Sequence, residues 1–196
     1  MKAGVIAVQG AVPEHLKALQ TAMLHLGIGG QVVPVRRNED LEVVDCLVIP
    51  GGESTTISRL LRRFGLFDRI VRLGNGGLPI LGTCAGCILL AKEGDDEVSK
   101  TGTELLGLMD MAVERNAFGR QRESFEVPIE VEGVYSPFRA VFIRGPVISR
   151  VWGKCEVLAK HENKIVMARQ GNLLALAFHP ELSNDTRIHE MLLSLV

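Results

Sequence analysis

The stretch Leu78-Pro79-Ile80-Leu81-Gly82-Thr83-Cys84-Ala85-Gly86 combines a buried strand, a sharp turn and the start of a helix. Its apolar residues predict a strand at 78–82, and the small residues Gly82 and Gly86 allow the chain to turn tightly around Cys84. This is the arrangement of a nucleophile elbow with cysteine in place of serine. The turn would expose the sulfur at the end of the strand, where the N–H groups of the following helix favour a thiolate. A buried cysteine in a tight turn would give the same pattern without any chemistry.

The rest of the first half of the chain alternates between apolar runs and amphipathic segments. We expect strands at 3–8, 31–35, 46–49 and 78–82, and helices at 13–26, 55–64, 67–73 and 85–92. Strands that alternate with helices indicate parallel pairing through β-α-β units. The polar stretch 94–103 is predicted to be a loop.

After this loop the pattern changes to strands with little helix between them. We expect strands at 125–131, 139–143, 156–159, 164–168 and 173–178, and a closing helix at 184–196. No internal repeat or clear domain boundary is visible. The sequence therefore predicts one α/β domain over residues 1–196. Its central sheet would be mostly parallel and flavodoxin-like, flanked by helices, with an antiparallel extension.

The composition is that of a globular domain and argues against several classes of protein. Hydrophobic residues make up 46% of the 196 residues and charged residues 23%, which is close to the average for soluble domains. With 22 Lys+Arg against 23 Asp+Glu the formal net charge is −1, so we expect no binding to nucleic acid. Two basic clusters, at 36–37 and 59–63, are interpreted as solvated faces. The alternative is a docking rim for an acidic partner.

The sequence also predicts a protein that does not span a membrane. The longest uncharged stretch, 73–91, contains Pro79 and five glycines, which is typical of turns around a strand. The first apolar run, 3–8, is short and soon meets Glu14, so we interpret it as a strand and not as a signal sequence. The four scattered cysteines fit reduced thiols in a cytoplasmic protein.

A cysteine nucleophile needs a base, and the base needs a group that orients it. His179 directly follows the apolar run 173–178, which places it at the carboxyl end of a strand, where α/β sheets carry their sites. Glu181 lies two residues further on, and Pro180 stiffens the link between them. We predict that Cys84, His179 and Glu181 form a catalytic triad. A histidine alone at a strand end is more often structural.

A second glycine-rich turn, Ile49-Pro50-Gly51-Gly52-Glu53-Ser54-Thr55-Thr56, also leads from a strand into a helix. Its glycines, Gly51 and Gly52, allow backbone amides to approach a ligand closely, so these amides could complete an oxyanion hole to which the Ala85 amide also donates. The simpler interpretation is a Gly-Gly turn with Ser54 or Thr55 as the helix N-cap. The Gly-Lys-Ser/Thr ending of a phosphate-binding loop is absent.

These motifs together resemble a known family. Gly-Thr-Cys-Ala-Gly at 82–86 with the distant His179-Pro180-Glu181 is similar to the class I, triad-type glutamine amidotransferases. Further segments resemble the glutaminase subunits of pyridoxal 5′-phosphate synthase within that family. These segments are Ala7-Val8-Gln9-Gly10-Ala11 with Glu14-His15, the 50–56 turn, Arg115-Asn116-Ala117-Phe118-Gly119-Arg120-Gln121, and Phe142-Ile143-Arg144-Gly145-Pro146. The resemblance covers essentially the whole chain.

The resemblance implies hydrolysis of L-glutamine to L-glutamate and ammonia through a glutamyl thioester, with no metal and no cofactor. It also implies a hetero-oligomeric complex with a separate synthase subunit, a barrel-type lyase. That subunit would use the ammonia, with a pentose phosphate and a triose phosphate, to make pyridoxal 5′-phosphate. Carried over by position, Cys84 is the nucleophile, His179 the base and then the acid, and Glu181 the group that orients it.

The same resemblance implies two sets of binding residues. The residues that would contact glutamine or line its site are Gly52, Glu53, Ser54, Arg115, Ile143 and Arg144. The residues of the oxyanion hole would be Gly52, Ala85, Gln9 and Gly10. Of these, Gln9 and Gly10 belong to a segment tied to formation of the hole when the partner docks. Ammonia is expected to pass to the partner through a channel, because free ammonia is readily protonated and lost.

One position departs from the pattern of the family. Cys87 stands where an aliphatic residue is expected, and Cys84-Ala85-Gly86-Cys87 is also a thiol–disulfide motif. We expect Cys87 to face the core, while a reversible Cys84–Cys87 disulfide stays open as a hypothesis. The alternatives to a glutaminase are a thiol-redox protein, another cysteine hydrolase such as an intracellular peptidase, and a non-enzymatic regulatory subunit.

Overall fold

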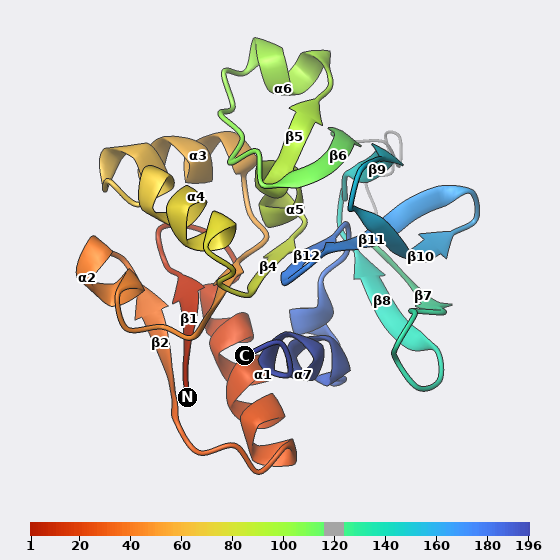
Figure 1. Ribbon diagram of the computed structural model, residues 1–196. Helices are drawn as coiled ribbons and strands as arrows, with labels where there is room; N and C mark the ends of the chain where they lie inside the picture. The colour runs from red at the N-terminus through yellow and green to blue at the C-terminus, as the bar shows by residue number, and fades with distance from the viewer. Residues whose placement is uncertain (116–123) are drawn as a thin grey trace.

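The computed structural model describes residues 1–115 and 124–196 (Figure 1). Its centre is a ten-stranded mixed sheet with the order β2-β1-β3-β4-β12-β11-β9-β6-β5, and β10 pairs with β11. The strands of the parallel half are β1 (Lys2–Ile6), β2 (Gln31–Val35), β3 (Cys46–Ile49), β4 (Ile80–Thr83) and β12 (Leu173–Leu176). The mostly parallel α/β sheet that the sequence predicts is therefore present.

The antiparallel extension begins beyond β12. Its strands are β11 (Lys164–Gln170), β10 (Glu156–His161), β9 (Val147–Val151) and β6 (Met109–Glu114). At its edge, β5 (Ala91–Gly94) runs parallel to β6. A separate antiparallel pair consists of β7 (Phe125–Ile129) and β8 (Phe138–Phe142). The antiparallel extension is thus also confirmed, with β6 and β9 as strands that the sequence pattern did not reveal.

Helices cover both faces of the sheet, so the parallel strands are buried on both sides (Figure 1). One face packs against α3 (Ser54–Arg63), α4 (Phe67–Asn75) and α5 (Ala85–Leu90). The other packs against α1 (Val12–His25), α7 (Arg187–Leu193) and the β7–β8 pair. Successive residues of a strand point to opposite faces, and accordingly Leu47 joins the first core and Val48 the second. No helix within the described ranges is long and apolar enough to cross a membrane.

The helix expected at 85–92 is too long. Helix α5 ends at Leu90, and Ala91 turns to an extended conformation (φ −67°, ψ 152°) at the start of β5. There Ala91 pairs with Met109 of β6. The apolar run is compatible with either element, and pairing with a strand distant in sequence decides between them.

The loop expected at 94–103 contains a short helix, α6 (Asp96–Lys100). The side chain of Asp95 accepts a hydrogen bond from the Val98 N–H at 2.9 Å and caps this helix. The loop prediction is wrong here because capping by Asp95 stabilises a short helix in a stretch whose polar composition alone favours a loop. A second short helix, α2 (Asn38–Leu41), was also not expected.

The closing helix expected at 184–196 is shorter than predicted. The single turn η1 (Pro180–Leu182) follows β12, and α7 spans only Arg187–Leu193. Between them, the Asp185 carboxylate accepts hydrogen bonds from the backbone and side chain of Arg187. This local turn delays the start of the helix.

Candidate active site

Cys84 lies in the sharp turn between β4 and α5. Its backbone has φ +49° and ψ −100°, a region that non-glycine residues rarely adopt, and its N–H donates to the Leu176 carbonyl at 2.8 Å. A Cβ atom on Gly86 would lie 2.1 Å from the Ile49 carbonyl oxygen, so only glycine fits where α5 crosses β3. The predicted strand–elbow–helix unit is present, and it holds the sulfur-bearing residue at the carboxyl edge of the sheet.

His179 and Glu181 meet Cys84 because β12 and β4 are adjacent parallel strands. Their pairing aligns Leu176 with Thr83, so the residues that follow each strand emerge at the same edge. Nδ1 of His179 lies 2.7 Å from Oε1 of Glu181, and both side chains are buried. The structure therefore brings together the three residues of the predicted triad.

The environment of His179 favours its protonated form. Burial alone would lower the pKa of this imidazole, but interactions with Cys84 and Glu181 outweigh burial and raise it to about 10. Since Nδ1 is bonded to Glu181, Nε2 is the nitrogen left for the sulfur. An imidazolium between a carboxylate and a thiolate is the charge arrangement of an activated cysteine nucleophile.

The Gly51–Gly52 turn packs directly on this group. A Cβ atom on Gly51 would lie 2.5 Å from Cε1 of His179 and 3.3 Å from Cβ of Cys84. The Gly51 carbonyl accepts a hydrogen bond from the Ala11 N–H at 3.0 Å. Ala85 is the first residue of α5, where a backbone N–H has no partner within its helix. The Gly51–Gly52 turn and the start of α5 thus both lie beside Cys84.

Gln9 and Gly10 hold the far side of the same turn. Oε1 of Gln9 accepts a hydrogen bond from the Glu53 N–H at 3.0 Å. A Cβ atom on Gly52 would lie 2.5 Å from that same oxygen, and one on Gly10 would lie 2.1 Å from the Gly51 carbonyl oxygen. Neither Gln9 nor Gly10 lines the cavity beside Cys84. In this structure they support the turn and do not face the reacting position.

A cavity of about 370 Å³ opens beside Cys84, which lies within the range of about 300–1,000 Å³ typical of small-molecule sites. It is lined by Gly52, Glu53, Ser54, Cys84, Ala85, Ile88, Arg115, Ile143, Arg144, Pro146 and His179. All six predicted glutamine-contacting residues are among them. Ile88 and Pro146 were not predicted, because an apolar wall gives no signal in the sequence that distinguishes it from the core.

Two charged residues of the cavity are already paired. Nη2 of Arg115 lies 3.0 Å from Oε1 of Glu53, and its Nη1 donates to the Thr101 hydroxyl at 3.1 Å. Glu53 caps α3 by accepting the Thr56 N–H at 2.7 Å, so the N-cap is Glu53 and not Ser54 or Thr55. Burial would raise the pKa of Glu53, but the hydrogen bonds from Thr56 and Thr55 and the charge of Arg115 lower it overall. The remaining residues of the Arg115 motif, 116–121, lie outside the described residues.

Two further cavity residues have unsatisfied or strained features. The Ser54 hydroxyl is buried and has no hydrogen-bond partner among the described residues. Arg144 has φ +46°, which is rare for a side chain of this size. Unpaired polar atoms and strained backbone concentrate at functional sites. Both observations suit a site that a polar ligand completes.

Cys87 faces the core, as the sequence predicts. It is fully buried among apolar side chains, and burial raises the pKa of its thiol strongly. Burial also raises the pKa of Cys46 to about 12 and of Cys155 to about 11. All four cysteines are free. Because a thiol must ionise to exchange with a disulfide, these surroundings make Cys87 a poor redox partner for Cys84.

Sequence reasoning missed the residues that lie behind the triad. His15 of α1 and His189 of α7 are completely buried, and Nε2 of His15 lies 3.3 Å from Oε2 of Glu181. Their positions on two different helices give no pattern in the sequence that would pair them. In the sequence, His15 stands out only as part of the Glu14-His15 segment.

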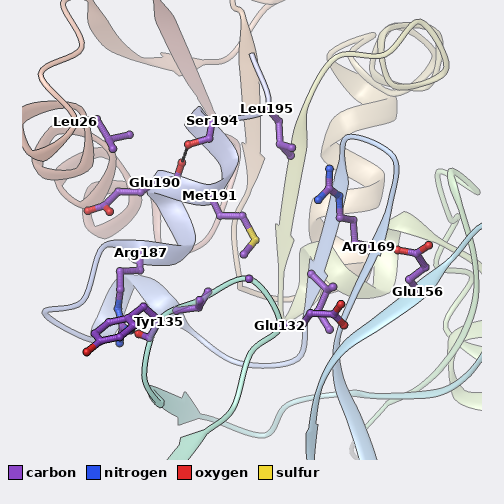
Figure 2. A pocket seen from close by; sticks show the side chains of 13 residues that line it. Leu26, Glu132, Tyr135, Glu156, Arg169, Arg187, Glu190, Met191, Ser194 and Leu195 are labelled. Atoms are coloured by element: carbon purple, nitrogen blue, oxygen red, sulfur yellow. Dashed lines mark hydrogen bonds between the residues drawn. The ribbon is translucent and has the colours of Figure 1, made fainter.

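A second cavity, of about 540 Å³, lies away from this site between α7, β10, β11 and the 132–135 segment (Figure 2). It contains no residue of the triad. One of its two arginines, Arg187, is held by the Asp185 carboxylate and by the carbonyls of Ser136 and Pro137. The larger of these two cavities is therefore not the one with catalytic groups.

Comparison with known proteins identifies relatives over the full length of the chain. The model of the SNO glutamine amidotransferase family matches residues 5–196. A protein from Archaeoglobus fulgidus named pyridoxal 5′-phosphate synthase subunit PdxT is 56% identical over 100% of this chain and 98% of its own length. A protein of the same name from Brevibacillus brevis is 53% identical over 100% of this chain and 97% of its own.

Solved structures agree with the sequence relatives. A crystal structure of a glutamine amidotransferase superposes with a TM-score of 0.87 at 45% identity, covering 98% of this chain and 97% of the other. The PurLQS structure from Thermotoga maritima gives a TM-score of 0.70 at 16% identity, covering 98% and 97%, and so shows a common fold alone.

Proposed function

Because the chain belongs to the SNO glutamine amidotransferase family, we propose that it hydrolyses L-glutamine as the glutaminase subunit of a pyridoxal 5′-phosphate synthase. Cys84 is the nucleophile, His179 the acid–base residue and Glu181 the group that orients His179. The observation that carries the proposal is the 2.7 Å contact between His179 and Glu181 beside Cys84, at the wall of the 370 Å³ cavity. The two side chains come from a Pro-stiffened turn that follows the strand next to the elbow.

The first half of the reaction forms a thioester. A carboxamide is a poor electrophile, which is why a thiolate and oxyanion donors suit this substrate. The Cys84 thiolate attacks the side-chain carbonyl carbon of glutamine, and the resulting oxyanion accepts hydrogen bonds from the Gly52 and Ala85 amides. His179 gives its proton to the departing nitrogen, the C–N bond breaks, and ammonia leaves. The glutamyl group stays on Cys84.

The second half releases glutamate. His179, now neutral, takes a proton from a water molecule that attacks the thioester carbonyl. The C–S bond breaks, glutamate leaves, and the thiolate and imidazolium are restored. Glu181 stabilises the imidazolium in both halves without itself being protonated. Because the pKa of His179 is raised, the imidazole still holds its proton when the glutamine nitrogen is ready to leave.

The cavity residues fit a substrate that carries both charges of a free amino acid. We assign Arg115 to the glutamine carboxylate and Glu53 to its ammonium group, since each offers the opposite charge. The unpaired Ser54 hydroxyl supplies a polar contact, and Ile143 and Arg144 contribute to the lining of the cavity. The Glu53–Arg115 pair at 3.0 Å keeps both charged groups in place before the substrate arrives.

The ammonia is passed to a synthase partner. The relatives are named as subunits of pyridoxal 5′-phosphate synthase, and we propose that this chain, as one glutaminase domain over 1–196, supplies the ammonia for that reaction. Gln9 and Gly10 support the Gly51–Gly52 turn, so partner docking near them would set the position of the Gly52 amide. The cytoplasmic location stays a prediction from the sequence.

Turnover of glutamine tests this function. Glutamate and ammonia are measured for the wild-type chain, alone and with a pyridoxal 5′-phosphate synthase partner subunit, and for Cys84→Ala. We expect partner-stimulated release of both products by the wild type and none above background by Cys84→Ala. Full activity of Cys84→Ala, or no turnover of glutamine under either condition, contradicts the proposal.

A further inference from the structure

The triad carboxylate has a second, buried neighbour that the reaction described above does not use. Oε1 of Glu181 is bonded to His179, whereas Oε2 has no hydrogen-bond partner among the described residues. Nε2 of His15 lies 3.3 Å from Oε2 without making a hydrogen bond to it, and both side chains are completely buried. The same nitrogen is hydrogen-bonded to the Thr83 hydroxyl at 3.1 Å. Thr83 directly precedes Cys84.

His15 is in turn held by another histidine. Nδ1 of His15 lies 3.0 Å from Nε2 of His189, and the two ring centroids are 5.3 Å apart. His15 belongs to α1 and His189 to α7, and these two helices pack against each other on one face of the sheet. His189, His15, Glu181, His179 and Cys84 therefore form one continuous buried chain of polar contacts.

We propose that His15 is a positioning residue for the triad: its Nε2–H, hydrogen-bonded to the Thr83 hydroxyl, lies beside Oε2 of Glu181, and His189 fixes the tautomer that puts the proton there. This inference rests on the proposed glutaminase function. It assigns neither residue to a reacting atom of the substrate. Both act through Glu181 and then through His179.

The two rings are neutral. Burial lowers the pKa of His15 well below its ordinary value, helped by the neighbouring His189 and His179, and burial lowers the pKa of His189 to about 4. The titratable groups that face His15 are His189 from α7, His179 after β12 and Glu181 of η1. A neutral ring has one N–H donor and one bare nitrogen, so the contacts decide where each proton lies.

One assignment satisfies the contacts better than the other. The Thr83 hydroxyl can donate to Nε2 of His15 or accept from it, but an ionised carboxylate can only accept, so Oε2 of Glu181 at 3.3 Å favours a proton on Nε2. Nδ1 of His15 is then bare and accepts the Nε2–H of His189. Nδ1 of His189 is left bare as well, which agrees with its having no partner among the described residues. The opposite assignment would leave an N–H of His189 buried without an acceptor and a lone pair facing the carboxylate, both of which are unfavourable.

A neutral donor suits this position better than a cation. It holds the carboxylate oxygen in place without neutralising the negative charge that stabilises the His179 imidazolium. A cationic His15 would compete with His179 for the same charge and lower the pKa of the acid–base residue. The alternative is that the two histidines only hold α1 against α7, in which case their tautomers and their effect on the triad would be incidental.

The test combines a spectroscopic signature with two matched variants of the full chain. Nitrogen NMR of the ¹⁵N-histidine-labelled wild type reads the tautomers directly and needs no activity. His15→Gln keeps an amide N–H₂ near the place of Nε2, whereas His15→Asn keeps one near Nδ1 and so faces His189 but not Glu181. Steady-state glutamine turnover with the synthase partner subunit, the pH profile of kcat/KM and the melting temperature are measured for each.

We expect His15 and His189 to carry their protons on Nε2. We expect His15→Asn to lose kcat about 10-fold, equivalent to about 1.4 kcal/mol, with KM little changed and the alkaline limb of the profile moved to lower pH. His15→Gln should stay close to wild type in glutamine turnover, in the pH profile and in melting temperature. A proton on Nδ1 of His15, or equal loss in the two variants in step with melting temperature, overturns the proposal. If the wild type does not hydrolyse glutamine, the function fails, and the NMR result still decides the tautomers.

Discussion

Nδ1 of His179 lies 2.7 Å from Oε1 of Glu181, in a site where both side chains are buried. This contact orients the imidazole so that its other nitrogen is free for Cys84, and it places a carboxylate beside the ring at low exposure to solvent. Charge-assisted hydrogen bonds of this kind are stronger than neutral ones, and burial strengthens them further. Burial acts to lower the pKa of His179, but the interaction with Cys84 and this contact with Glu181 together raise it.

Replacement of the carboxylate tests the role of this contact. Glu181→Gln keeps the shape of the side chain but removes its charge, so the imidazolium loses its stabilising partner. We expect kcat to fall about 100-fold or more, in line with the usual contribution of positioned acid–base groups. The control is Glu190→Gln, which removes the carboxylate that contacts His25 at the surface. Loss of activity in Glu190→Gln of the same size would contradict the assignment.

The raised pKa of His179 predicts a specific pH dependence. Its pKa is about 10 in the folded chain against an ordinary 6.5. The folded state therefore binds the proton more tightly, and the resulting stabilisation is fully present below about pH 6.5 and is lost as the pH rises through about 10. Because the proton is needed for the leaving nitrogen, we expect kcat/KM to decline with an alkaline limb near pH 10.

The pH profile of kcat/KM checks this for the wild type and for Glu181→Gln, whose limb should lie at lower pH. His25→Gln, at an exposed histidine, should leave the profile unchanged. An alkaline limb near pH 6.5 in the wild type would show that the surroundings of His179 do not favour its protonated form.

Support of the Gly51–Gly52 turn by Gln9 is a second testable feature. Gln9→Leu removes the oxygen that accepts the Glu53 N–H, and loss of a hydrogen bond worth about 1 kcal/mol corresponds to about a fivefold change. We expect kcat with the synthase partner to fall by about that factor or more, because the Gly52 amide is no longer held in place. Gln20→Leu, an exposed position on α1, is the control. Unchanged partner-stimulated kcat in Gln9→Leu would exclude this role.

The Glu53–Arg115 pair predicts an effect on binding more than on chemistry. Arg115→Lys keeps the charge but cannot contact Glu53 and Thr101 with a planar fork of donors. We expect KM for glutamine to rise about 10-fold, equivalent to about 1.4 kcal/mol, with kcat less affected. Arg150→Lys, whose guanidinium pairs with exposed Glu93, should change neither constant. A fall in kcat at constant KM in Arg115→Lys would contradict a binding role.

The sequence predicted the centre of this site well because its signals are local. The turn at Cys84 needs small neighbours, and the residue after β12 must emerge beside it once the strands pair in parallel. Cys84, His179 and Glu181 could therefore be placed from short-range chemistry and one rule about parallel sheets. The roles of Gly52, Glu53 and Ser54 in contacting glutamine came from the resemblance of the 50–56 turn to the family.

What the sequence could not predict depends on contacts between distant segments. The change from α5 to β5 at Ala91 is decided by pairing with Met109, which the apolar run itself does not show. His15 and His189 are 174 positions apart and meet only because α1 packs against α7. Nothing in either segment distinguishes a buried histidine from an exposed one.

The central claim is that Cys84 attacks the side-chain carbonyl of glutamine, and site-specific labelling tests it most directly. A diazo-ketone analogue of glutamine alkylates a nucleophile that faces the glutamine side chain, and peptide mass spectrometry locates the label in the full chain with its synthase partner. We predict one label per chain, at Cys84, formed in step with the loss of glutamine hydrolysis and prevented by excess glutamine. Labelling at another residue, or complete inactivation while Cys84 stays unlabelled, would contradict the account.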